Sequence, residues 1–114
     1  MTIKNEGAPF FRFTHVTEPR LYWQGIKTVR VVKRALSEGT LRRFGDIELR
    51  IGDNDESGLG NTQFRFNPLV GYYPGNNIEP VAIFGPLNNV QGRFLTLQRI
   101  SIGYLDVAEI YVFN

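Results

Sequence analysis

The sequence contains no cysteine, which excludes disulfides, thiolate metal sites and cysteine nucleophiles. The same absence favours a reducing compartment over an oxidising one. No apolar run approaches the roughly 20 residues that a membrane-spanning helix needs, so we expect no membrane span. The segment 1–11 holds one lysine and no apolar core, so no secretory signal peptide is visible.

An excess of charge of either sign is also missing. The 114 residues carry 13 Lys and Arg against 11 Asp and Glu, and this net charge of +2 is too small to predict a nucleic-acid partner. Seven basic residues gather between positions 27 and 50 together with three acidic ones. One interpretation is that this segment binds nucleic acid, with nearby aromatic side chains stacking on the bases. A solvated sheet face of mixed sign explains it equally well, and we expect no nucleic-acid partner.

Strand signals dominate the chain. β-branched residues and period-2 alternation predict strands at 28–33, 46–51, 63–66, 81–84, 94–97 and 104–113. Within 46–51 three apolar residues alternate with Glu48 and Arg50, so we expect these two charged side chains to face water. The segment 35–39 forms one helical turn at most. The pattern predicts a single all-β domain over residues 1–114, an antiparallel sandwich or barrel.

Several short sequence motifs occur along the chain in a specific order. Residues 92–97 read GRFLTL and residues 104–113 read YLDVAEIYVF. They follow TVRVVKR at 28–34, DIELRIG at 46–52 and NPLVG at 67–71, after a Thr-His pair at 14–15 and a Tyr-Trp pair at 22–23. In this order the motifs resemble the F5/8 type C (discoidin) domains, and among them the fucolectins, or F-type lectins, which are galactose-binding-domain-like.

The resemblance implies a jelly-roll β-sandwich whose loops bind a glycan or glycoprotein, fucose-like sugars first. It also implies an extracellular protein of the cell-adhesion kind. The chain departs from the family pattern, because the opening strand and most of the calcium loop are missing. Val70 and Ala108 stand where two cysteines would be. Apolar residues in place of both disulfide partners are compatible with the fold.

In the fucolectins a histidine, an arginine, an aspartate two residues later and a second basic residue hold the sugar. By resemblance His15 and Arg34 take the first two positions, and Arg43 or Arg42 takes the last. Guanidinium and imidazole groups donate hydrogen bonds to sugar hydroxyls. The alternative is structural, with His15 exposed or hydrogen-bonded and without a ligand, and with Arg42 and Arg43 in a solvated turn.

The orienting carboxylate is the main departure at this predicted site. Leu36 stands in the position of the aspartate, so the group that would fix Arg34 is lost. Glu38, two residues further on, is the candidate replacement.

Calcium is the structural ion that the resemblance implies. Glu109 matches the family's carboxylate from the last strand, and the segment around Asn5 is a remnant of the partner loop. Calcium takes oxygen ligands, many of them backbone carbonyls. Otherwise Glu109 pairs with a nearby arginine or lysine.

Two functions are compatible with these features. The first is a non-catalytic lectin in which the loss at Leu36 has been compensated. The second is a protein-interaction or assembly module that kept the scaffold and lost the sugar site. A sandwich that lacks an edge strand exposes unpaired backbone groups, so we expect a homo-oligomer.

Other chemistry has little basis in the sequence. One histidine and three serines occur in no catalytic motif, so we expect that the chain is not an enzyme. The aromatic segments 21–23 and 72–75 leave two interpretations open. They either pack on a sugar or lipid, or anchor the core and its loops.

Overall fold

The computed structural model describes residues 2–4, 23–54, 66–101, 105 and 107–113. Its elements are β1 (Thr2–Lys4), β2 (Trp23–Ile26), β3 (Thr28–Lys33), α1 (Glu38–Arg42), β4 (Ile47–Gly52), β5 (Leu69–Tyr73), β6 (Val81–Phe84), β7 (Val90–Gly92), β8 (Phe94–Arg99) and β9 (Val107–Phe113). His15 and Asn5 lie outside the described residues, so the predictions that depend on them stay predictions.

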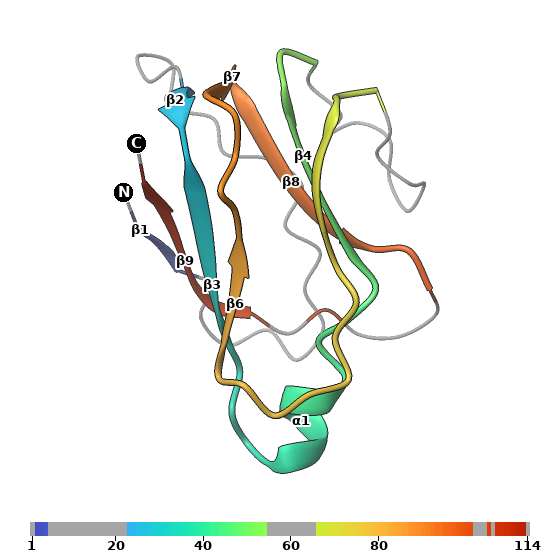
Figure 1. The fold of residues 1–114 in the computed structure, drawn as a ribbon. Helices are drawn as coiled ribbons and strands as arrows, with labels where there is room; N and C mark the ends of the chain where they lie inside the picture. The colour runs from blue at the N-terminus through green and yellow to red at the C-terminus, as the bar shows by residue number, and fades with distance from the viewer. Residues whose placement is uncertain (1, 5–22, 55–65, 102–104, 106, 114) are drawn as a thin grey trace.

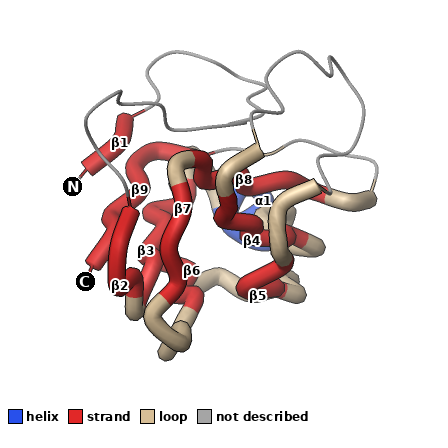
Figure 2. The backbone as a smooth tube through the Cα atoms, turned by 90° about the horizontal axis from the view of Figure 1, so that it is seen from above, coloured by secondary structure: helices blue, strands red, loops and turns tan. Residues whose placement is uncertain are grey.

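The strands form two main sheets and a short ribbon. One sheet has the order β1-β9-β3-β6 and the other the order β5-β4-β8, while β2 pairs with β7. The pairings within all three are antiparallel. The two main sheets lie as two layers, and α1 closes one end (Figures 1 and 2). The prediction of an all-β antiparallel fold is therefore confirmed.

Buried apolar side chains from both main sheets fill the space between the two layers. Val29 and Val31 of β3 and Ile110 of β9 come from one sheet, and they share a single cluster with Leu49 of β4 and Leu97 of β8. All five side chains are buried. Burying an aliphatic side chain of this size contributes about 1.5–3 kcal/mol. For β4 the period-2 pattern of the sequence had identified this core face, with Ile47, Leu49 and Ile51.

The predicted strands match the structure unevenly. The strands predicted at 28–33 and 81–84 are β3 and β6, and that at 94–97 is the first part of β8. The last strand begins at Val107 and not at 104, and β4 is displaced by one residue from 46–51. Residues 63–65 lie outside the described part, and Phe66 is exposed and belongs to no strand. The sequence did not predict β1, β2, β5 or β7.

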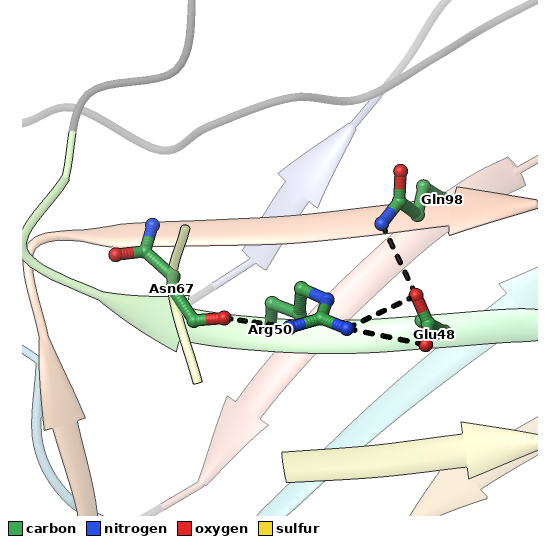
Figure 3. A network of polar contacts seen from close by, with 4 residues as sticks. All are labelled: Glu48, Arg50, Asn67 and Gln98. Atoms are coloured by element: carbon green, nitrogen blue, oxygen red, sulfur yellow. Dashed lines mark hydrogen bonds and ion pairs between the residues drawn. The ribbon is translucent and has the colours of Figure 1, made fainter. Parts of the chain in front are cut away.

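The prediction that Glu48 and Arg50 face water is wrong. Glu48 is 7% exposed, although it lies on the face of β4 opposite the core. Arg50 places Nη2 3.3 Å from Glu48 Oε2 and donates from Nη1 to the backbone oxygen of Asn67 at 2.9 Å. Gln98 of β8 donates to Glu48 Oε1 at 3.3 Å (Figure 3). Because the carboxylate is paired and hydrogen-bonded, this second, polar layer is buried without an isolated charge.

The strand β1 forms one edge of the β1-β9-β3-β6 sheet. β1 pairs with β9 over three residues, from Thr2 opposite Tyr111 to Lys4 opposite Glu109. β9 therefore has β1 on one side and β3 on the other. Whether the family's own opening strand is missing stays a prediction, and so does the oligomer inferred from it.

Candidate functional site

The connection between β3 and β4 carries four of the predicted sugar-binding residues, and its shape follows from a local capping box. Ser37 accepts a hydrogen bond from the backbone N–H of Thr40 at 3.2 Å, and the Thr40 hydroxyl accepts from the Ser37 N–H at 2.9 Å. These two hydrogen bonds satisfy backbone N–H groups that have no partner within the first turn of a helix. The single helical turn α1 therefore begins at Glu38 and ends with Arg43 as its C-cap.

Within α1, Glu38 and Arg42 bind one another. Arg42 donates to Glu38 Oε1 from Nη2 at 2.9 Å and from Nε at 3.1 Å, and both side chains are largely exposed. This is the i,i+4 spacing that places two side chains on one face of a helix. Glu38 thus orients Arg42, while Leu36 is 70% exposed. Arg34 follows directly after β3 and is half-buried.

A second cluster lies where β4 begins, next to the strand ends of β5 and β8. The hydroxyl of Tyr72 donates to Asp46 Oδ1 at 2.7 Å. Hydrogen bonds from Tyr72 and from Ser101, with the nearby charge of Arg99, hold the pKa of Asp46 below its ordinary value. The same bond to Asp46 raises the pKa of Tyr72. The cluster therefore presents an ionised carboxylate beside a neutral phenol.

Arg99 joins this cluster to α1. Its Nε donates to Ser101 Oγ at 3.2 Å, and its Nη1 donates to the backbone oxygen of Arg43. Arg99 therefore links the backbone at the end of α1 to the Asp46 cluster.

Two glycines allow the connections at this end to approach one another. A Cβ on Gly45 would lie 2.6 Å from the backbone oxygen of Pro74, and a Cβ on Gly75 would lie 2.3 Å from the Gly45 Cα. Gly75 also has φ of +83°, which favours glycine. Asp46 donates its N–H to the Pro74 oxygen at 3.1 Å. The segment after β5 is therefore docked directly against the start of β4.

A buried lysine lies close to Phe44 and Tyr73. Lys33, the last residue of β3, is 1% exposed, and its ammonium donates to Asn77 Oδ1 at 2.8 Å. The ammonium also lies 5.0 Å from the centroid of the Tyr73 ring and 5.7 Å from that of Phe44. No ion pair with a carboxylate accompanies it in the described part of the chain. Aromatic faces and an amide oxygen thus take the place of a counter-ion.

Of the two predicted calcium ligands, the structure describes Glu109 alone. Glu109 of β9 accepts the hydroxyl of Tyr111, and Asn5 lies outside the described residues. Among the residues that the structure describes, no three His, Cys, Asp or Glu side chains are grouped to hold a metal. Calcium at Glu109 therefore stays a prediction of the resemblance alone.

Of the second cluster, the sequence drew attention only to Tyr72, within the aromatic segment 72–75, and it missed Asp46 and Arg99. Asp46 was assigned to a strand, whereas it lies just before β4 with φ of +55°. Aspartate is one of the few residues that adopt this conformation readily, so the Gly-Asp pair at 45–46 was the available signal. Arg99 carried no signal, because its role depends on strand pairing between β4 and β8.

Comparisons of this chain with protein-family models, with curated proteins and with solved structures find no match. Within the described residues no helix has the length and hydropathy that a bilayer crossing requires.

Proposed function

We propose that this chain is a non-catalytic glycan-binding module, a jelly-roll domain of the discoidin kind that holds its ligand at the α1 end of the sandwich. Fucose-like sugars are the first candidates, on the resemblance of the sequence to the fucolectins. Arg34, Arg42 and Arg43 supply hydrogen-bond donors for sugar hydroxyls. His15 belongs to the same proposal through the resemblance alone.

The observation that carries this proposal is the Asp46 carboxylate at the same end of the molecule. Sugar hydroxyls both donate and accept hydrogen bonds, so a sugar site needs an acceptor as well as arginines. Leu36 removes the acceptor that the family pattern places there, and Glu38 is engaged by Arg42. Asp46 offers a carboxylate three residues after Arg43. Arg99 lies near this carboxylate and donates to the Arg43 backbone oxygen.

A glycan array, run once with calcium and once with a chelator, tests the proposal. We expect binding to fucosylated or galactose-terminated glycans, and loss of that binding in the variants His15→Ala and Arg34→Ala. Arg30→Ala, which removes an arginine from the outer face of the β1-β9-β3-β6 sheet, is the matched control and keeps binding. Absence of glycan binding both with calcium and with the chelator would contradict the proposed sugar site.

The second candidate is a protein-interaction module, and the outer face of the same sheet favours it. Ile83 is 55% and Phe113 43% exposed there. The guanidinium of Arg30 lies 5.4 Å from the centroid of the Phe113 ring. Aromatic and arginine side chains are enriched at protein interfaces. A shift from dimer to monomer in light scattering on Ile83→Asp, with unchanged glycan binding, would support this candidate.

A further inference from the structure

Tyr72 is an aromatic side chain held in place at the surface. Its side chain is 51% exposed, yet its hydroxyl is tied to Asp46 at 2.7 Å. The ring therefore presents apolar surface to water while one end is fixed by a hydrogen bond. Side chains with an apolar body and a hydrogen-bonded polar tip are suited to ligands that have both an apolar face and polar groups.

The carboxylate beside this ring is equally fixed. The backbone of Asp46 donates to the Pro74 oxygen at 3.1 Å and accepts from the Ile100 N–H at 3.0 Å. An ionised carboxylate offers about four acceptor positions on its two oxygens. The hydroxyls of Tyr72 and Ser101 engage two of these. Acceptor capacity thus remains at a group that needs no rearrangement to bind a ligand, and such preorganisation increases affinity.

We propose that Tyr72 and Asp46 form a subsite for a neutral hexopyranose. The C–H face of the sugar ring packs on the Tyr72 ring, and two adjacent hydroxyls donate to Asp46. An acceptor-only carboxylate selects hydroxyl donors and repels a sugar that carries a carboxylate or sulfate. This inference rests on the proposed function, since it names the ligand class and two contact residues of the same surface.

Calorimetric titration with methyl fucoside, methyl galactoside and the anionic methyl glucuronide tests the subsite. At least one neutral glycoside binds, and the glucuronide binds at least about tenfold more weakly. Asp46→Asn keeps the shape of the side chain and tolerates φ of +55°. It weakens neutral sugar binding by about tenfold, because hydrogen bonds to a charged group are lost.

Variants of the ring separate contact from structure. Tyr72→Ala weakens binding by about tenfold, and Tyr72→Phe, which keeps the ring, weakens it by less. Phe113→Ala removes another exposed ring at a distant position and leaves binding unchanged. The unfolding midpoint of each variant is measured alongside, so that a folding defect is recognised.

Each failure has a separate meaning. If Asp46→Asn and Tyr72→Ala bind the neutral glycoside as tightly as the unmodified chain, the subsite is wrong while the proposed function stands. Preference for the glucuronide overturns the ligand class. If the array and all three glycosides show no binding, the proposed function and the subsite are both overturned.

Discussion

Lys33 donates a hydrogen bond to Asn77 at 2.8 Å from inside the protein, where its side chain is 1% exposed. This contact spans the end of β3 and the segment that follows β5. Asn77 Oδ1 also accepts from the Tyr73 hydroxyl at 3.0 Å and from the Glu79 N–H at 3.1 Å. The buried lysine therefore supports the same end of the sandwich that carries Asp46 and Arg43.

The first prediction concerns the side chain of Lys33. Lys33→Ala removes a long buried stem and leaves a cavity, so it lowers the free energy of unfolding by about 2–4 kcal/mol. Lys33→Met keeps most of the packing, and Asn77 Oδ1 still has two donors, so its stability stays within about 1.5 kcal/mol of the unmodified chain. Urea unfolding measures both. Equal losses for the two variants would show that the charge, and not the packing, is what stabilises.

The glycine contact leads to a second prediction. Gly45→Ala brings a Cβ to 2.6 Å from the Pro74 oxygen, and we expect a loss of about 1–3 kcal/mol from overpacking. Gly39→Ala is the matched control, because its Cβ would meet nothing closer than 3.5 Å and it lies in α1. That variant gains up to about 1 kcal/mol. A neutral Gly45→Ala variant in thermal unfolding would contradict the close approach.

The buried polar layer leads to a third prediction. Arg50→Met leaves the Glu48 carboxylate buried without its ion-pair partner, at a cost of about 3 kcal/mol. The double variant Glu48→Gln/Arg50→Met removes that charge as well and is more stable than Arg50→Met alone. Denaturant unfolding of Glu48→Gln, of Arg50→Met and of the double variant gives the coupling energy between the two side chains. Additive losses would show that the two side chains do not interact.

The fourth prediction concerns pH. The pKa of Tyr72 is raised above its ordinary value of 10.0 by its bond to Asp46. This contribution to stability is present below pH 10 and is lost as the pH rises through the folded-state pKa. The pKa of Asp46 is lowered from 3.8, so its contribution is present above that pH and is lost as the pH falls through the folded-state pKa.

Titration by tyrosine absorbance checks the alkaline side. Asp46→Asn removes the charged acceptor and moves the titration of Tyr72 down toward pH 10. Tyr111, whose pKa is raised by its bond to Glu109, serves as the internal reference and does not move. An unchanged Tyr72 titration in Asp46→Asn would mean that the two side chains are apart in solution.

The sequence predicted the parts of the fold that depend on local alternation. The strand 28–33 was found because it is rich in β-branched residues, of which Val29 and Val31 face the core, and the strand 81–84 was found because it is a short apolar run. Strand β5 was missed because it carries Gly71, where a Cβ would lie 2.8 Å from Phe84 of the opposite sheet. In a sequence, glycine indicates a turn. Its place in this strand is explained only by the close packing of the two sheets.

The candidate site was predictable only in part. Arg42 and Arg43 were named from the sequence, and the structure places them on α1 and at its end. The pairing of Glu38 with Arg42 follows from helical spacing, which the sequence did not assign there. Asp46 and Tyr72 are 26 positions apart, and only the antiparallel pairing of β4 with β5 brings them together.

The measurement that tests the account most directly is nuclear magnetic resonance of the isotope-labelled chain, titrated with methyl fucoside and methyl galactoside. We predict that the shifted amides cluster at Asp46, Tyr72, Arg43 and their neighbours at the α1 end. Shifts confined to Arg30, Ile83 and Phe113, on the outer face of the other sheet, or no shifts with either sugar, would contradict a glycan site at the α1 end.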